Sequence, residues 1–396
     1  MSDIKTDPIV IVSYARTPLG AFQGGLSAVT APELGSIAIK AALKRGGVSE
    51  HDVDEVYMGN VLSAGLKQAP ARQAALGAGL PKSVPSTTIS KVCGSGLKAV
   101  MLAFDGLHVR TGEIVVAGGM ESMTNAPFLL PNARAGMRYG HGQVLDHMAY
   151  DGLENAYDGQ SMGIFAEATA DKYEFTREAQ DEYAIRSLSR STEAASNGAF
   201  DGEIVAVTVK SRRGDVIVDK DEGPQNARPE KIPTLRPAFC KGGTVTAANS
   251  SSINDGAAAL VVMRASTAKE KGLTPICEIV GTQSFAQEPE WFTTAPVCAI
   301  KRLLKNLGWA AGDVDLYEIN EAFACVAMAA IKNLGLDEDK VNVNGGACAI
   351  GHPIGASGAR ILVTLIHALK VRGKSTGIAS LCIGGGEAVA LGVKML

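Results

Sequence analysis

Two stretches of the chain carry the same order of apolar and polar positions. Residues 38–54 read AIKAALKRGGVSEHDVD and residues 299–315 read AIKRLLKNLGWAAGDVD, and the two align without a gap at an offset of 261. In both, apolar positions recur at helical spacing, which predicts an amphipathic helix followed by a loop. A short apolar run then predicts a strand in each, at Glu55–Met58 and at Leu316–Ile319.

The match resumes further along, at an offset of 262. The paired positions are Ser95-Gly96 with Ser357-Gly358, and Val109-Arg110 with Val371-Arg372. Apolar helical segments lie between these anchors, and a strand ending in glycines follows each of them, at Ile114–Gly119 and Gly377–Gly386. Two matches in register indicate an internal duplication of one α/β unit.

The duplication predicts the domain organisation. One half covers residues 1–120 and is completed by about residues 250–271, because the Ala-rich apolar run at 253–263 returns to its core. The other half covers residues 272–396, and the unrepeated residues 121–249 predict an inserted loop domain. Since strands alternate with helices, the expected class is α/β with mainly parallel, buried sheets.

Composition narrows the class of protein. Of 396 residues, 46% are apolar and 20% charged, as in a soluble globule too large for one core. The net charge of −3 gives no general attraction to nucleic acid or to an anionic membrane. No run of 18 apolar residues occurs, and the start, Met-Ser-Asp-Ile-Lys-Thr-Asp, lacks the features of a signal or transit peptide. A cytoplasmic protein is therefore expected.

One of the seven cysteines stands in unusual surroundings. There is no Cys-x-x-Cys pair, so reduced thiols without a metal site are expected. Cys93, however, lies in Lys91-Val92-Cys93-Gly94-Ser95-Gly96, just before an apolar run that predicts a helix. Free backbone N–H groups at such a helix start stabilise a thiolate and lower its pKa, which makes Cys93 a candidate nucleophile. The alternative is a buried structural cysteine at a helix cap.

A histidine occupies nearly the same place in the second copy. His352 lies in the segment Gly351–Gly358, which reads GHPIGASG and leads into a helix, three residues ahead of the strict counterpart of Cys93. A two-fold repeat brings the two helix starts towards one cleft, where a cysteine and a histidine form an activated nucleophile pair. A histidine in a glycine loop can also be a simple turn or capping residue.

Two further motifs follow strands of the second copy. Cys382 precedes Gly384-Gly385-Gly386, whose exposed N–H groups suit an oxyanion, although such a triplet also makes an ordinary turn before a last strand. Asn320 opens the segment Asn320-Glu321-Ala322-Phe323. It is either an amide that faces a ligand or the N-cap of the next helix.

Together these motifs resemble those of the thiolases. The four segments are Val92–Gly96, Asn320–Phe323, Gly351–Gly358 and Cys382–Gly386, and the similarity runs from Ala15-Arg16-Thr17-Pro18 to the end of the chain. The sequence looks most like the acetyl-CoA acetyltransferases of that family. The resemblance implies a five-layer αβαβα fold of two pseudo-symmetric halves with an inserted loop domain. It also implies an acyltransferase that condenses two acetyl-CoA reversibly to acetoacetyl-CoA and CoA through an acyl-cysteine.

The resemblance implies a role for each motif. Cys93 would be acylated after activation by His352, and Cys382 would move the proton at the α-carbon. The N–H groups of Cys93 and Gly384 would hold the oxyanion of the acyl-enzyme. His352 and a water bound by Asn320 would hold the thioester oxygen of the second substrate.

The resemblance also implies contacts outside the reacting atoms. Ser251 would contact the pantetheine arm of coenzyme A, and Arg228 and Lys231 its adenine nucleotide end. Coenzyme A thioesters would be substrates, with no tightly bound cofactor and no metal. The assembly would be a homotetramer, a dimer of dimers joined partly through the loop domain, and neither nucleic acid nor a membrane would be a partner.

Three positions depart from the short-chain pattern of that family. Ser161-Met162-Gly163 stands where His-Met-Gly is common, Glu387-Ala388 where Met-Gly is common, and Trp291-Phe292 where Ile-Met is frequent near the acyl pocket. Met162, Phe292 and Phe323 are the expected pocket residues, and Phe292 bears on chain length.

Three other functions compete with this interpretation. The main alternative is a broad-chain 3-ketoacyl-CoA thiolase of fatty-acid β-oxidation. Decarboxylating ketoacyl synthases share the fold but use a Cys-His-His or Cys-His-Asn set, which Cys382 in the third position argues against. A catalytically inactive acyl-CoA-binding relative would be expected to lack one of the reactive residues, and all are present.

Overall fold

A computed structural model describes residues 7–109, 111–212 and 214–396. Residues 1–6, on which the expectation about a targeting signal depends, lie outside the described residues. So do Arg110, one of the paired positions of the repeat, and Arg213.

Nine described strands form one path of hydrogen-bonded neighbours, which divides into two sheets. The first sheet contains β1 (Ile9–Arg16), β3 (Glu55–Gly59), β4 (Ser86–Ile89), β5 (Ile114–Ser122) and β10 (Asn254–Arg264), and the short β2 (Gly20–Ala21) lies beside β10. The second sheet contains β11 (Cys277–Ala286), β12 (Leu316–Ile319), β13 (Thr376–Ile383) and β14 (Glu387–Met395). The orders are β4-β3-β5-β10-β1 and β12-β13-β14-β11. The two sheets join where Val10 and Ile11 of β1 pair with Glu278 and Cys277 of β11.

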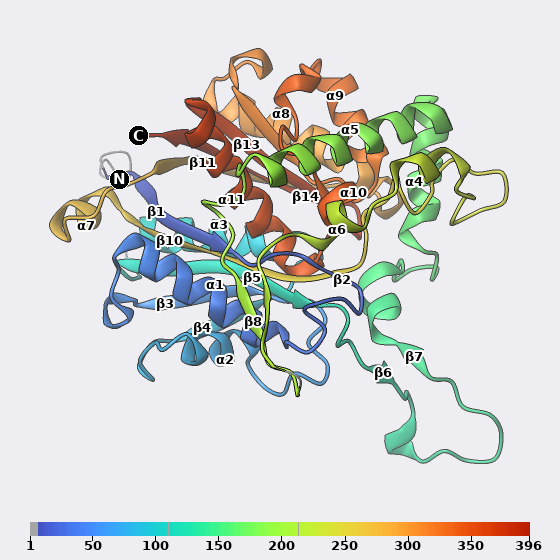
Figure 1. Cartoon of the computed structure of the whole chain (residues 1–396), viewed down its shortest axis with the longest axis horizontal. Coiled ribbons are helices and arrows are strands. Elements are labelled where there is room, and N and C mark those ends of the chain that lie inside the picture. Colours follow the sequence, from blue (N-terminus) through green and yellow to red (C-terminus); the bar gives the residue numbers. More distant parts are fainter. Residues whose placement is uncertain (1–6, 110, 213) are drawn as a thin grey trace.

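Helices form the other three layers. Helices α3 (Ser95–His108) and α11 (Ile354–Arg372) pack against each other and against strands of both sheets, so they make the central layer. The outer face of the first sheet is covered by α1 (Ala31–Gly46) and α2 (Pro70–Gly77), and that of the second by α8 (Ala295–Leu307) and α9 (Ala324–Leu334). The order is αβαβα, as Figure 1 shows, so the predicted five-layer fold is confirmed.

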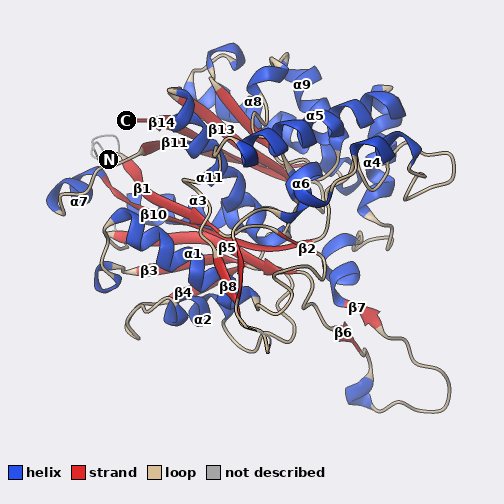
Figure 2. Cartoon of the chain, viewed as in Figure 1, coloured by secondary structure: helices blue, strands red, loops and turns tan. Residues whose placement is uncertain are grey.

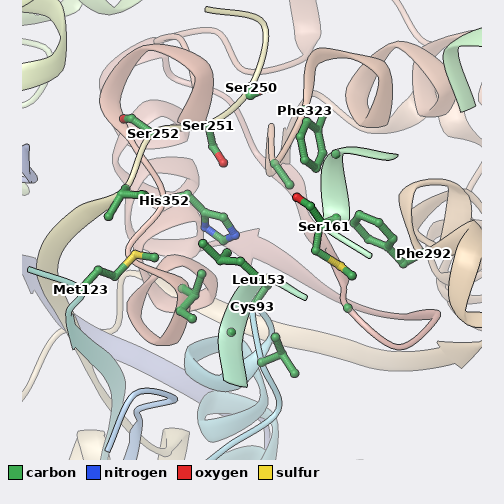
Figure 3. A pocket seen from close by; sticks show the side chains of 18 of the residues that line it. Cys93, Met123, Leu153, Ser161, Ser250, Ser251, Ser252, Phe292, Phe323 and His352 are labelled. Atoms are coloured by element: carbon green, nitrogen blue, oxygen red, sulfur yellow. The ribbon is translucent and has the colours of Figure 1, made fainter. Parts of the chain in front are cut away.

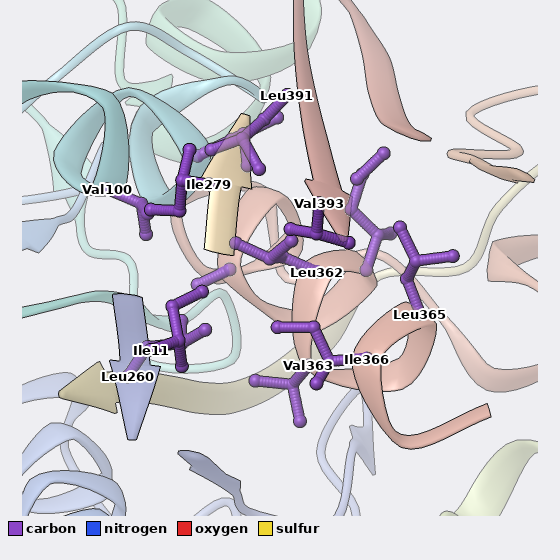
Figure 4. Close-up of a cluster of buried hydrophobic side chains, with 14 of the residues drawn as sticks. Ile11, Val100, Leu260, Ile279, Leu362, Val363, Leu365, Ile366, Leu391 and Val393 are labelled. Carbon is purple, nitrogen blue, oxygen red and sulfur yellow. The ribbon is translucent and has the colours of Figure 1, made fainter. Parts of the chain in front are cut away.

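The central core holds the layers together. Figure 4 shows Ile11 and Leu260 of the first sheet facing Leu391 and Val393 of the second, with apolar side chains of α11 between them. Along β10, alternate residues point inward to this core and outward to α1, so all of its residues are buried. A strand covered on both faces is continuously apolar, which explains the Ala-rich run seen in the sequence.

Helix α11 is the one described helix that is long and apolar enough to cross a membrane. Nearly all of it is buried between the two sheets, however, so it is a core helix. It also carries charged or titratable side chains, Arg360 and His367, that have partners inside the protein.

The prediction of mainly parallel sheets is wrong. Parallel pairing is limited to β3 with β4 and β5, and to β12 with β13, while the other pairs are antiparallel. The reason lies in the connections: β13 and β14 are joined by a three-glycine hairpin turn, in which Gly385 and Gly386 have φ values of 93° and 88°. A hairpin makes neighbouring strands antiparallel, and β10 enters from the inserted segment rather than from a helical crossover.

The inserted segment divides into an excursion and a helical part. The excursion, residues 125–147, contains the two-stranded β6 (Phe128–Leu129) and β7 (Leu145–Asp146) and projects from the body of the protein in Figure 2. The helical part of the insert contains α4 (Met162–Tyr173), α5 (Arg177–Ser196), β8 (Val207–Val209), β9 (Val216–Val218) and α6 (Glu222–Asn226). Outside the insert lie the short helices α7 (Ala265–Glu270) and α10 (Ala347–Ile350). Short helical turns occur at Glu50–Asp52, Ala133–Ala135, Ala149–Leu153, Pro229–Thr234, Pro289–Thr294, Ala311–Asp313 and Glu338–Lys340.

A buried ion cluster locks the helical part of the insert onto the first half. Arg16 at the end of β1 has no exposed surface, and its guanidinium bonds Glu203 at 2.6 Å and Asp221 at 2.7 and 2.9 Å. Burial opposes the charge on Arg16, but the two carboxylates raise its pKa above the ordinary value. Breaking such a pair leaves an uncompensated buried charge, so the insert is firmly held against the sheet that carries Cys93.

Candidate active site

The turn that carries Cys93 is tight and strained. It connects β4 with α3, and Val92 has a φ of 44°, a left-handed conformation that β-branched residues rarely adopt. Ser95 closes the turn: its Oγ accepts from the Lys91 N–H at 2.8 Å and donates to the Val92 carbonyl at 2.6 Å. A Cβ at Gly94 would lie 2.4 Å from Cδ1 of Ile383, so a larger residue there would have to displace that side chain of the second half.

The Cys93 thiol is enclosed, and this changes its acidity. The N–H groups of Gly384 and of Cys93 itself point at the sulfur and favour a thiolate. Burial outweighs them and raises the pKa of the Cys93 thiol to about 11. The expectation of a lowered pKa is therefore wrong for the free protein, because desolvation exceeds the helix-start contribution. Cys93 rests as a thiol and needs a base.

His352 is such a base, and its tautomer follows from its neighbours. Its Nδ1 lies 2.5 Å from the Ser357 Oγ, and that hydroxyl donates its own proton to the Pro353 carbonyl at 2.9 Å. Nδ1 therefore carries the ring proton and donates it to Ser357. The other nitrogen, Nε2, is buried without a hydrogen-bond partner among the described residues.

The imidazole of His352 is neutral. Burial, with a further contribution from the Arg360 charge, lowers its pKa to about 3. A neutral ring with a free Nε2 can accept a proton from a thiol, and His352 and Cys93 line the same cavity in Figure 3.

Asn320 lies next to this histidine. Its Nδ2 is 3.5 Å from Nδ1 of His352, and its Oδ1 is 3.5 Å from Nη2 of the buried Arg360. Because Oδ1 faces a donor, the amide turns its own N–H groups towards the histidine side. The N-cap alternative does not hold, since α9 begins at Ala324 and Phe323 is its N-cap residue.

Cys382 and Gly384 approach Cys93 from the other half. Cys382 is fully buried within β13, and burial raises the pKa of its thiol well above the ordinary value, with a further contribution from Cys93 nearby. Gly384 begins the turn that follows β13 and lines the cavity beside Cys93. The structure therefore brings together Cys93, His352, Asn320, Cys382 and Gly384.

The cavity has a volume of about 230 Å³ and mainly apolar walls. Of the predicted residues, Ser251, Met162, Phe292 and Phe323 line it. Phe292 stands edge-on to Phe323 with ring centres 6.5 Å apart, so the two rings form one wall. The volume corresponds to roughly eight water molecules, enough for a small group.

Several wall residues escaped the sequence analysis: Met123, Leu153, Phe239, Ser250 and Ser252. They belong to irregular segments without periodicity, so nothing local marked them. Phe239 left an indirect signal, because Gly163 faces it and a Cβ there would lie 2.2 Å from its ring. His147 is buried and bonds Asp151 at 2.5 Å and the Ala64 N–H at 3.3 Å.

Arg228 and Lys231 lie away from this cavity. Both are exposed, beside or within the short helical turn Pro229–Thr234, which is anchored by the buried Ile232. The geometry leaves them free to meet a ligand that extends out of the cavity, and it does not join them to the reacting groups.

The chain is similar to known proteins over nearly its whole length. Residues 9–266 match the thiolase N-terminal domain, and residues 273–395 match the thiolase C-terminal domain. The acetyl-CoA acetyltransferase of Cupriavidus necator is 53% identical over 98% of this chain and 99% of its own length. The acetyl-CoA acetyltransferase of Escherichia coli is 51% identical over 98% of this chain and 99% of its own length.

Solved structures agree with the sequence matches. The crystal structure of the Bacillus anthracis acetyl-CoA acetyltransferase has a TM-score of 0.96 and 45% identity, covering 98% of this chain and 99% of that one. A thiolase from Ascaris suum in complex with coenzyme A has a TM-score of 0.93 and 44% identity, covering 98% of this chain and 100% of that one.

The neutral resting pair gives a testable pH dependence. A thiol with a raised pKa gains thiolate as the pH increases, so alkylation of Cys93 by iodoacetamide should accelerate steadily from pH 6 to pH 10. The rate is followed by peptide mapping, with Cys93→Ser as the blank for the other cysteines. A plateau beginning below pH 8 would instead indicate a thiolate–imidazolium pair.

Proposed function

The chain belongs to the thiolase family, and from this premise we propose that Cys93 carries the acyl group between two coenzyme A thioesters. The protein is an acetyl-CoA acetyltransferase, which condenses two acetyl-CoA reversibly to acetoacetyl-CoA and CoA. The observation that supports the role of Cys93 most is the meeting of its thiol, two N–H donors and the free Nε2 of a neutral His352 at one cavity. Acetoacetyl-CoA chemistry is favoured over the broad-chain alternative by the relatives' names.

The first half-reaction acylates Cys93. Nε2 of His352 takes the thiol proton, and the sulfur attacks the thioester carbon of acetyl-CoA. The negative oxygen of the tetrahedral intermediate is held by the N–H groups of Cys93 and Gly384, which already point at the sulfur. Protonated His352 then returns its proton to the departing CoA sulfur, so that free CoA leaves and acetyl-Cys93 remains.

The second half-reaction forms the carbon–carbon bond. In this proposal the Cys382 thiol first passes its proton to Nε2 of His352, which leaves a thiolate at Cys382. A second acetyl-CoA then places its thioester oxygen at this Nε2–H and at a water held by Asn320, and both polarise the carbonyl. Cys382 removes a proton from the α-carbon, and the enolate attacks the carbonyl of acetyl-Cys93. Breakdown of that intermediate cleaves its bond to the Cys93 sulfur and releases acetoacetyl-CoA. Protonated His352 returns its proton to Cys93, while Cys382 keeps the α-proton, so both cysteines end as thiols. A thiol with a raised pKa makes a strong base once it is deprotonated, so Cys382 is well suited to remove a proton from the α-carbon.

The substrates bind without a resident cofactor in this proposal. Ser251 at the cavity wall contacts the pantetheine arm, while Arg228 and Lys231 on the surface attract the phosphates at the adenine end. The known complex of the related Ascaris suum thiolase with coenzyme A supports this class of ligand. We propose a soluble cytoplasmic enzyme, since the one long apolar helix among the described residues is a core helix.

The proposed assembly is a homotetramer, a dimer of dimers. Strand β4 lies at the free edge of the first sheet, where a second copy can add its own strand. The excursion exposes apolar side chains, among them Phe128, Met137 and Tyr139, which suit a contact between dimers. In this proposal residues 1–120 and about 250–271 form the first half, 272–396 the second, and 121–249 the loop domain for coenzyme A and tetramer contacts.

Chain length tests the activity directly. With a small cavity closed by Phe292 and Phe323, CoA-dependent cleavage of acetoacetyl-CoA should exceed that of a C8–C10 ketoacyl-CoA at least tenfold in kcat/KM. The Phe292→Ala variant should narrow the difference, because it removes a wall and lengthens the cavity. Equal cleavage of both substrates by the unaltered enzyme would restore the broad-chain alternative.

Substitution of Cys93 and substitution of Cys382 should impair different steps of the reaction. Cys93→Ala should abolish both the exchange of labelled CoA into acetyl-CoA and the cleavage of acetoacetyl-CoA, because no acyl-enzyme forms. Cys382→Ala should retain exchange, which needs no α-proton, while cleavage falls about 10²- to 10⁴-fold, the usual range for an acid–base group. Equal loss of both activities in Cys382→Ala would refute its assignment as the acid–base residue.

The excursion is the test of the assembly. Phe128 and Leu129 of β6 pair with Asp146 and Leu145 of β7, so an Asn-Gly turn in place of residues 130–144 keeps the hairpin. It removes the exposed side chains of Leu130, Met137, Tyr139 and Val144. Sedimentation should change from tetramer to dimer with cleavage activity retained. A shortened variant that stays tetrameric, or an unaltered protein that sediments as a monomer, would contradict the proposal.

A further inference from the structure

An ion pair joins the two turns that carry the oxyanion donors. Lys91, two residues before Cys93, pairs through its Nζ with Oε2 of Glu387, three residues after Gly384. Lys91 belongs to the first half of the repeat and Glu387 to the second, so the pair bridges the halves. The side chains are 24% and 36% exposed, which leaves the pair at the rim rather than in the core.

Neither the turn that carries Cys93 nor the glycine turn that carries Gly384 is held rigid by its own residues. The glycine turn has φ values of 93° at Gly385 and 88° at Gly386, and no atom lies within 4 Å of a Cβ built on Gly385. Gly386 is anchored on one side, where its carbonyl accepts the Gln287 N–H at 2.8 Å. On the side facing Cys93, the Lys91–Glu387 pair is the charged contact at the base of the turn.

The Cys93 turn is strained in a way that needs support. Val92 adopts its φ of 44° between the paired Lys91 and Cys93, and residues held in such a conformation persist only when their surroundings fix them. Ser95 holds the backbone of Lys91 from one side through the 2.8 Å hydrogen bond to its N–H. Glu387 holds the end of the same residue from the other side.

We propose that Lys91 and Glu387 are positioning residues that fix the separation between the N–H of Cys93 and the N–H of Gly384. The inference rests on the proposed role of these two groups as the oxyanion hole. The pair acts through geometry, since it bridges the two turns and neither of its side chains lines the cavity.

The expected effect is on acylation rather than on binding. Removing one oxyanion donor altogether lowers kcat about 10²- to 10³-fold, and a donor that is only displaced costs less. A break of the pair should therefore lower the rate of Cys93 acylation by about tenfold and change KM for acetyl-CoA less than about threefold. Both side chains lie outside the residues that line the cavity, which is why binding should be spared.

A charge swap tests the pair. Lys91→Glu and Glu387→Lys each place like charges against one another, and the double variant restores an opposite pair in reverse order. Single-turnover transfer from acetyl-CoA to Cys93 should be slow in each single variant and return to within about threefold of the unaltered rate in the double variant. Lys271→Glu, which reverses a charge in the distant pair with Asp52, is the matched control and should leave acylation unchanged.

The outcomes separate this inference from the proposed function. Single variants as fast as the unaltered enzyme, or a double variant as slow as the slower single one, would overturn the positioning role. If a reversal prevents folding, Lys91→Met and Glu387→Gln replace it, with thermal unfolding measured beside the rate. An unaltered enzyme that never acetylates Cys93 would refute the proposed function instead.

Discussion

The direct contact between the backbones of α3 and α11 is the constraint on which the site depends. A Cβ on Gly96 would lie 2.8 Å from the Ala359 nitrogen, and one on Gly358 would lie 2.3 Å from the Leu97 nitrogen. Any side chain at either position would push the helices apart, so these glycines set the thickness of the central layer. The helix starts then meet at one end of that layer, and with them Cys93 and His352.

Burial at that meeting point decides the protonation of the resting site. Desolvation raises the pKa of Cys93 to about 11 and lowers that of His352 to about 3, so the neutral form of each is favoured. The N–H groups at the sulfur are then held ready for an oxygen that becomes charged during the reaction. Hydrogen-bond donors that are already in place before the negative charge develops are an example of electrostatic preorganisation in a cavity that excludes water.

Much of this architecture could be predicted from the sequence because short segments of the chain carry the signals for it. The duplication appears as a repeated pattern, and Cys93, His352, Cys382 and Asn320 each stand beside glycines or at a strand end. What failed depends on contacts between distant segments. The antiparallel pairing of β10 arises from β1 and β5, both more than a hundred residues away. The sign of the Cys93 pKa shift arises from burial in the folded protein, and the place of Phe239 in the wall from its contacts with Gly163 and Phe323. Neither propensity nor periodicity carries such information.

The pairing of β1 with β10 also has a consequence during protein synthesis. Ile9 pairs with Arg264, so the first strand of the chain has no central partner until some 255 later residues have been added. At about 5–20 residues per second, that wait lasts roughly 13–50 s. Throughout it, an apolar strand with two unsatisfied edges is exposed to other nascent chains, which makes early chaperone contact more valuable to this fold than to one built from neighbouring strands.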